Sequence, residues 1–300
     1  SLLSWVFGKR NPVSVSMNIT SDWHIHSRNS CDEAALAMAD LLAAAPRLGI
    51  RDFGVTDHLH TPYNLPDIAN SRSEFDSVAP GPHFHFGIEV SCVSAWELDE
   101  IACGRHDRPV YGVRAGGPRG APLAIGLERE DIGRFGIEFV VGGAHWPMYV
   151  PFEREAIIRD YHRQNMFLAQ HPLVDIVAHP WWWMGDGQDA AGNYPDEPWL
   201  GDFARIPRSM HDDFAAACRE GRTKAEINLG AILLNPRYPE SFRRQYAEYL
   251  AELKGKGVRL SLGSDCHDAR YAPDFAGASA RLDAVGISES DCWTIGKEAP

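Results

Sequence analysis

The sequence has no long apolar run, and this absence argues against a membrane-spanning protein. A membrane helix needs about 20 consecutive apolar residues, and no stretch of the 300 residues approaches that length. The opening segment SLLSWVFGKR (residues 1–10) places its basic residues after its short apolar run, which is the reverse of a signal peptide. We therefore expect a cytoplasmic protein that has no membrane partner.

Paired cysteines and positive charge are also scarce. The six cysteines are scattered without a CxxC motif, so we expect free thiols in a reducing compartment. The formal net charge is −12, which argues against an extended nucleic-acid-binding surface. A local positive pocket is still compatible with this total, because carboxylates that bind metal ions contribute to the negative charge.

Strand-like runs rich in β-branched residues alternate with helical patterns along most of the chain. Such alternation is typical of an α/β protein, in which helices cover a parallel sheet. The predicted strands lie at 13–26, 50–58, 83–91, 136–145, 173–180, 224–229 and 258–265. The predicted helices lie at 32–49, 154–171, 210–220 and 239–257.

Two segments do not follow this alternation. Residues 92–134 are rich in Gly, Pro and Arg, and we interpret them as an insertion over one face that carries its own hairpin. Residues 181–207 form a second long loop, which begins with three tryptophans. Loops of this length in compact domains are usually functional or disordered. No interdomain linker is evident, so we expect a single domain over residues 1–300.

The stretch DWHIHS contains the pair His24 and His26 at the end of the first predicted strand. Alternate residues of a strand point to the same face, so both imidazoles would project together and could bind one metal ion. One such pair is weak evidence by itself. The sequence holds two more, His58/His60 and His83/His85, and we expect the last pair to be structural.

Histidines and acids recur at the carboxyl ends of the other predicted strands. In a (β/α) barrel these ends converge on one face, where active sites lie. This placement favours a closed (β/α)7 barrel, similar to a TIM barrel, over an open sheet. The strand-end residues are His24, His26, Asp57, His58, Glu89, His145, His179, Asp265 and His267.

The ordered motifs resemble those of the polymerase and histidinol phosphatase (PHP) superfamily. The matching stretches are DWHIHS, SCDE, VTDH, GIEV, GGAH, VAHP and GSDCH, between residues 22 and 267. The resemblance implies a distorted seven-stranded barrel with up to three divalent metal ions. The implied ligands are His24, His26, Glu89 and Asp265 for the first ion, Glu89, His145 and His179 for the second, and Asp32, His58 and His267 for the third.

Mixed imidazole and carboxylate ligation suits zinc, manganese or iron(II), and the sequence does not choose among them. Two or three such ions would lower the pKa of a bridging water, and the resulting hydroxide could attack phosphorus without a serine or cysteine nucleophile. Cys266 lies between Asp265 and His267, and we expect it to face away from the ions and to pack.

Several nearby residues have two interpretations. Asp57 either orients a ligand or caps a turn, and His60 either contacts the substrate or is a polar loop residue; we take both as candidate catalytic residues. Glu226 and Asn228 end the sixth strand and could line the pocket. The arginines closest to the motifs, Arg28, Arg237 and Arg270, are expected to be solvated surface charges.

The predicted function is metal-dependent hydrolysis of a small phosphomonoester, with histidinol phosphate as the substrate that the resemblance suggests. A phosphodiesterase or nuclease remains an alternative. A second alternative is an amidohydrolase, which also opens with HxH but commonly needs a carboxylated lysine on its fourth strand, where this chain has none. A third is a non-catalytic barrel that binds a partner, although such a protein would be expected to lose ligands.

Overall fold

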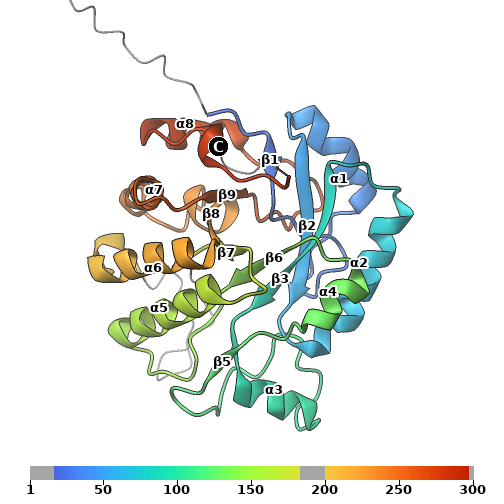
Figure 1. Cartoon of the computed structure of the whole chain (residues 1–300), viewed down its shortest axis with the longest axis vertical. Coiled ribbons are helices and arrows are strands. Elements are labelled where there is room, and N and C mark those ends of the chain that lie inside the picture. Colours follow the sequence, from blue (N-terminus) through green and yellow to red (C-terminus); the bar gives the residue numbers. More distant parts are fainter. Residues whose placement is uncertain (1–16, 183–199, 297–300) are drawn as a thin grey trace, which may run out of the picture.

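A computed structural model describes residues 17–182 and 200–296, which contain a sheet of seven parallel strands. The order of the strands in the sheet follows their order in the chain (Figure 1). The strands are β1 (Ser21–Asp22), β2 (Asp52–Leu59), β3 (Phe84–Ser91), β6 (Phe139–Gly143), β7 (Ile176–Ala178), β8 (Lys224–Asn228) and β9 (Leu260–Gly263).

Backbone hydrogen bonds join the first strand to the last and close the sheet. The amide of Trp23 donates to the carbonyl of Leu262 at 2.8 Å. Just beyond both strands, Asp265 donates to the carbonyl of His24 at 2.8 Å, and His26 donates to that of Cys266 at 3.0 Å. The seven strands therefore form a distorted barrel, as the sequence predicts.

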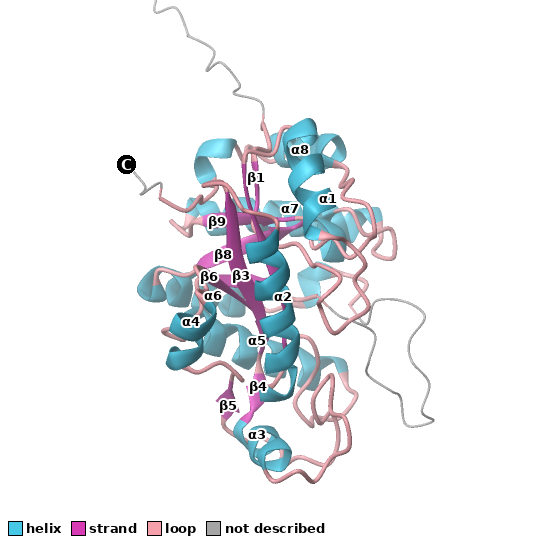
Figure 2. Cartoon of the chain, turned by 90° about the vertical axis from the view of Figure 1, so that its right-hand side faces the viewer, coloured by secondary structure: helices cyan, strands magenta, loops and turns pink. Residues whose placement is uncertain are grey.

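Helices surround this barrel, as Figures 1 and 2 show from two directions. Three of the four predicted helices are confirmed, as α5, α6 and α7, while α2 and α8 have no counterpart in the sequence analysis. No helix in the described ranges is long and apolar enough to span a bilayer. The main helices are α1 (Met38–Ala44), α2 (Leu65–Ser77), α5 (Arg154–Gln170), α6 (Arg208–Gly221), α7 (Glu240–Gly255) and α8 (Phe275–Ala284).

The predicted helix over residues 32–49 is wrong in its first third. The α-helix begins at Met38 and continues as a 3-10 helix over Ala45–Leu48. Residues 32–37 cross the barrel mouth instead, where Ala35 donates to the carbonyl of His267 at 3.2 Å and Leu36 accepts from Arg28 at 2.8 Å. These contacts with distant residues override the helical propensity of an Ala- and Leu-rich segment.

Within residues 92–134, where we expected an insertion with its own hairpin, two short strands pair across a long connection that contains a helix. Strands β4 (Val93–Ser94) and β5 (Leu123–Ala124) pair antiparallel, and α3 (Ala95–Ala102) follows β4 at the lower end of the molecule in Figure 1. Helix α4 (Arg129–Phe135) then leads into β6 and completes the crossover from β3. Of the second predicted loop, residues 183–199 lie outside the described residues.

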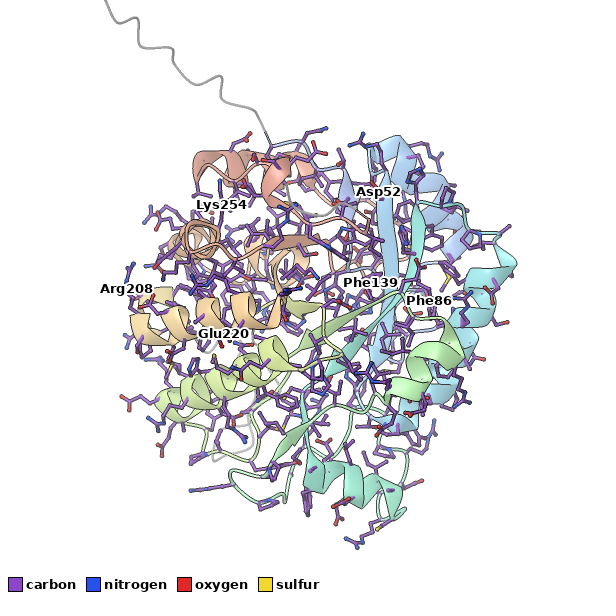
Figure 3. The ribbon with its side chains drawn as sticks, viewed as in Figure 1. Asp52, Phe86, Phe139, Arg208, Glu220 and Lys254 are labelled. Carbon is purple, nitrogen blue, oxygen red and sulfur yellow. The ribbon has the colours of Figure 1, made fainter. Side chains whose placement is uncertain are left out.

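Aromatic side chains fill the barrel near the amino ends of its strands. Phe139, labelled in Figure 3, occupies space left by Gly54 and Gly87, where an added Cβ would approach its ring within 2.6 Å. Trp23 packs edge-on against Phe139 and donates from Nε1 to the carbonyl of Trp293 at 3.1 Å. Side chains therefore fill the interior of the barrel at this end.

Candidate metal centre

The carboxyl ends of the strands bring all nine predicted ligands into one cluster. Strands β2 and β3 provide His58 and Glu89 from within their own length. The other residues follow immediately after strands, except Asp32, which comes from the segment that crosses the barrel mouth. The residues that converge are His24, His26, Asp32, His58, Glu89, His145, His179, Asp265 and His267.

Glu89 lies at the centre of this cluster and is fully buried. Its Oε2 atom lies 2.9 Å from His24 Nε2 and 3.1 Å from His58 Nδ1. Its Oε1 atom lies 3.1 Å from both His145 Nε2 and His179 Nε2. One carboxylate thus has four imidazole nitrogens within 3.1 Å of its two oxygens.

The first implied ligand set is compact. The ligand atoms of His24, His26 and Glu89 all lie within 4.8 Å of one another. Asp265 Oδ1 lies 3.2 Å from His26 Nε2 and 3.5 Å from His24 Nε2. These four side chains come from the two strands that close the barrel and from β3.

The implied third ligand set lies toward the solvent. Asp32 Oδ2 is 3.1 Å from His58 Nε2 and 2.5 Å from His267 Nε2, and His26 joins the same group. The side chain of His267 is 39% exposed, which makes this the open side of the cluster. A further group joins His58, Glu89 and His145, so His58 can serve either neighbouring position.

Several buried atoms of the cluster have no hydrogen-bond partner among the described residues. Unpaired buried polar atoms are costly and rare, so a cluster of them indicates a missing partner. Nitrogen-rich and carboxylate donors at these separations fit borderline divalent cations such as zinc, manganese or iron(II). The atoms without a hydrogen bond are His26 Nδ1, Asp32 Oδ1, His58 Nδ1, His145 Nε2 and His179 Nδ1. Of these, His58 Nδ1 and His145 Nε2 lie within ion-pair distance of Glu89, at 3.1 Å.

The pKa values of the side chains in the cluster are strongly perturbed. Burial alone would raise the pKa of the Glu89 carboxyl, but the surrounding imidazoles, His24 first, hold that pKa well below its usual value. Burial lowers the pKa of His145 to about 4. Burial also opposes the charged form of His24, yet Glu226 and Glu89 raise its pKa well above 6.5. A cation would therefore compete with a proton at His24.

Strained backbone conformations and two glycines, Gly143 and Gly263, make room for the cluster. His179 and Asp265 have positive φ values of 24° and 55°, a left-handed conformation that non-glycine residues seldom adopt and that concentrates at functional sites. At Gly143, a Cβ would lie 2.8 Å from Glu89 Oε1 and from His145 Cε1. Gly263 leaves similar space for Glu226, since a Cβ there would lie 2.0 Å from its Oε1.

Strand β8 contributes orientation in place of a direct ligand. Glu226 Oε1 accepts a hydrogen bond from His24 Nδ1 at 2.7 Å, and its Oε2 accepts from the His179 amide at 2.7 Å. Asn228 Nδ2 donates to Glu226 Oε2 at 2.9 Å and to Asp265 Oδ2 at 3.1 Å. Carboxylates that hold the second nitrogen of a ligating histidine fix its tautomer. In the sequence, this role was indicated only by the position of Glu226 and Asn228 at the end of the sixth predicted strand.

The two candidate catalytic residues lie in different places. Asp57 points out of the barrel, where its carboxylate accepts from the hydroxyls of Ser27 at 2.6 Å and Ser71 at 2.5 Å. It does not touch the cluster and instead ties the segment after β1 to α2. His60 lies inside, stacked on His58 with ring centroids 4.4 Å apart. Burial and the neighbouring imidazoles lower the pKa of His60 well below 6.5.

The remaining candidates lie outside the cluster. Cys266 is buried, and its Sγ faces the carbonyl of Arg270 at 3.9 Å, consistent with a packing role. His83 and His85 form ion pairs with Asp52 and Glu138, each at 2.7 Å. Arg28 is exposed and pairs with Glu74 at 3.0 Å.

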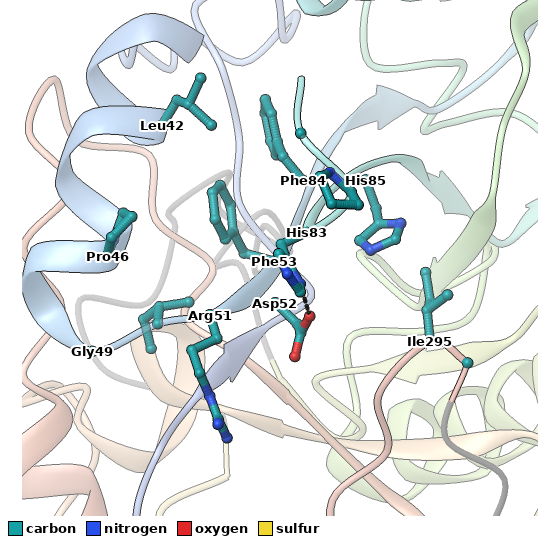
Figure 4. A pocket seen from close by; sticks show the side chains of 14 residues that line it. Leu42, Pro46, Gly49, Arg51, Asp52, Phe53, His83, Phe84, His85 and Ile295 are labelled. Carbon is teal, nitrogen blue, oxygen red and sulfur yellow. Dashed lines mark hydrogen bonds and ion pairs between the residues drawn. The ribbon is translucent and has the colours of Figure 1, made fainter. Parts of the chain in front are cut away.

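Two cavities lie at opposite ends of the barrel. One of about 490 Å³ opens beside Asp265 and His267 and is also lined by Trp182, Leu234 and Arg237. The other, about 800 Å³, lies at the amino ends of β2 and β3, as Figure 4 shows. None of the candidate metal ligands lines the larger cavity, so the smaller one is the candidate substrate pocket.

No family model and no curated protein sequence matches the chain, whereas solved structures do. A Listeria monocytogenes protein, described as the putative histidinol phosphatase hisK, superposes with a TM-score of 0.54 at 11% identity, over 83% of this chain and 96% of that one. The apo structure of ATU3138 from Agrobacterium tumefaciens gives a TM-score of 0.38 at 12% identity, over 91% of this chain and 89% of that one. An L-hydantoinase from Arthrobacter aurescens gives 0.23 at 11% identity, over 83% and 40%. The comparison therefore shows a fold shared with the Listeria monocytogenes protein, in agreement with the barrel described above.

Proposed function

We propose that this protein is a metal-dependent phosphoesterase that hydrolyses a small phosphomonoester. The observation that carries the proposal is the convergence of four imidazoles on the two oxygens of the buried Glu89 carboxylate. A carboxylate in this position can bridge two cations, and bridged metal centres are a common solution to phosphoester hydrolysis.

The cluster would hold two or three divalent ions. His24, His26, Glu89 and Asp265 would hold one, with His145 and His179 beside Glu89 for the next, and Asp32, His58 and His267 for a third. When bound, such ions supply a water of lowered pKa and stabilise the charge that develops on the phosphoryl oxygens. Zinc, manganese and iron(II) all suit this donor set.

The chain's own residues would position the substrate. The open side at His267 leads directly into the 490 Å³ cavity, so the phosphoryl group would lie at the cluster and the organic part in that cavity. Trp182 and Leu234 provide apolar surface there, and Arg237 provides a cationic group. This volume suits a small molecule better than a polymer.

Two observations favour this proposal over its alternatives. The lysines within the described ranges pair with Asp175, Asp291 and Asp212 and take no part in the cluster, which leaves an amidohydrolase without its carboxylated lysine; they are Lys224, Lys254 and Lys256. All nine ligand candidates are present, whereas a non-catalytic barrel would be free to lose them.

The six cysteines are unpaired, which supports a reducing compartment such as the cytoplasm.

The test is release of inorganic phosphate from a panel of phosphomonoesters that includes histidinol phosphate, with Zn²⁺, Mn²⁺ or Fe²⁺ added. His24→Ala should abolish both activity and the tightest metal site. His83→Ala is the matched control, because it removes a histidine from a surface HxH pair. Metal-dependent release by the wild type and by His83→Ala, but not by His24→Ala, supports the proposal. If the metal-loaded protein releases no phosphate from any member of the panel, the proposal is refuted.

A further inference from the structure

A buried hydroxyl connects the candidate metal cluster to His60. Alternation along β3 turns Gly87, Glu89 and Ser91 to the interior of the barrel. Ser91 Oγ lies 2.7 Å from His60 Nδ1 and 2.8 Å from His145 Nδ1. Ser91 has no exposed surface, and no other side-chain hydrogen bond is formed by its hydroxyl within the described ranges.

The number of available protons constrains these two contacts. A serine hydroxyl has one hydrogen to donate, and a neutral imidazole has one N–H and one nitrogen with a lone pair. If both imidazoles donated to Ser91, the buried hydroxyl hydrogen would have no acceptor, which is unfavourable. The satisfied arrangement therefore has Ser91 accepting from one histidine and donating to the other.

A cation bound to His145 would determine which imidazole donates to Ser91 and which accepts from it. His145 Nε2 faces Glu89 Oε1 at 3.1 Å and has no hydrogen-bond partner among the described residues. A cation there needs the lone pair of Nε2, so the ring hydrogen must lie on Nδ1 and be donated to Ser91. Ser91 then donates to His60 Nδ1, and the hydrogen of His60 must lie on Nε2.

We infer that Ser91 is a positioning residue, which couples occupation of the His145 metal site to the tautomer of His60. The inference rests on the proposed metal site but not on the identity of the substrate. No net proton is gained or lost, because each ring moves its hydrogen from one nitrogen to the other.

The surroundings of His60 give this coupling a consequence. His60 Nε2 is buried and unpaired among the described residues. Its ring lies between His58, His145, Tyr111 and Trp146, with centroid distances from 4.4 to 5.6 Å. A bound cation would fix His60 as an N–H donor within this wall of the site, whereas the metal-free protein allows the opposite tautomer.

Histidine tautomers can be read directly in the intact protein. Protein labelled with ¹⁵N-histidine would be titrated with Zn²⁺, which is diamagnetic, and followed by long-range ¹H–¹⁵N correlation spectra; His60→Gln assigns the His60 signals. We expect His60 in the Nε2–H form once His145 signals report Zn²⁺ binding. A zinc-loaded protein whose His60 stays in the Nδ1–H form overturns the inference without any variant.

Ser91→Ala adds a second measurement. We expect zinc affinity at the His145 site to fall about 10- to 100-fold, as is typical when a metal ligand loses its outer partner, and the His60 tautomer to become independent of Zn²⁺. Ser261→Ala is the control, since Ser261 is a buried strand serine whose Oγ is unpaired among the described residues. Unchanged affinity and unchanged coupling in Ser91→Ala would refute the role of Ser91.

These outcomes separate the inference from the proposed function. Zinc coupling without phosphate release leaves the role of Ser91 intact and refutes the phosphoesterase. Phosphate release without a tautomer change refutes the role of Ser91 alone. Absence of any zinc effect on His145 overturns the inference, and absence of phosphate release with every added metal overturns the proposed function as well.

Discussion

The carboxylate of Glu226 offers the sharpest test of how the cluster is held together. Its Oε1 accepts from His24 Nδ1, and its Oε2 accepts from the His179 amide and from Asn228 Nδ2. In Glu226→Gln, an NH₂ group replaces one oxygen and must face a donor in either orientation. Loss of a hydrogen bond to a charged group costs about 1.5–3 kcal/mol. We therefore expect metal affinity at His24 to fall about 10- to 100-fold, the usual effect of losing such a partner.

Chelator competition with Zn²⁺ would give the affinity, and mass spectrometry of the metal content would give the number of ions retained. Glu220→Gln is the control, because Glu220 is an exposed residue of α6 on the outside of the molecule (Figure 3). Unfolding in the presence of EDTA would separate lost stability from lost metal binding. If Glu220→Gln and Glu226→Gln bind zinc equally well, Glu226 does not support His24 and our reasoning is wrong.

Three further predictions concern the frame of the site. Burial raises the pKa of the Glu97 carboxyl from 4.5 to about 7. Between pH 4.5 and 7, the folded state keeps a proton that the unfolded state releases. The free energy of unfolding should therefore fall by about 3 kcal/mol as the pH rises from 4.5 to 7. Urea unfolding at pH 4.5 and 8 should show this loss in the wild type but not in Glu97→Gln, and equal losses would contradict it. Gly143→Ala should lower the number of bound metal ions, because its Cβ would crowd Glu89 and His145, whereas Gly133→Ala, whose Cβ would meet open space, should not. Equal metal content in the two variants would show that the cluster does not need the space at Gly143. Phe139→Ala should cost about 4 kcal/mol by urea unfolding, and a cost below about 1 kcal/mol would mean that its ring does not fill the barrel.

The sequence is most informative where residue type and strand position coincide. The histidines and acids at strand ends could be placed together because parallel strands in a barrel end on one face. The period of a strand placed His24 and His26 on one face, but β1 ends at Asp22 in the structure, and the pair was weak evidence until the other strand ends were considered. Glu89 could be placed at the end of its strand, but its central position among four imidazoles depends on how the other strands are arranged around it.

Other features depend on partners that are distant in sequence. Asp32 lies in a segment with strong helical propensity, and contacts with His267 rather than local preference decide its conformation. Ser91 looks like any strand serine until two histidines from other strands are brought to it. Helix α2 was missed because few of its residues are apolar, and of these Ile68 and Phe75 are buried. Long-range packing determines all three, and no local pattern reports it.

The joint between β1 and β9 also sets the order of events during synthesis. His24 and His26 emerge from the ribosome long before Asp265 and His267, which lie in the segment that follows β9. Because backbone bonds between these segments close the barrel, neither the ring nor its full ligand set can exist on a chain that stops before β9. Capture of metal ions would then wait for β9, and a chain that stops before Leu260 should be inert rather than partly active.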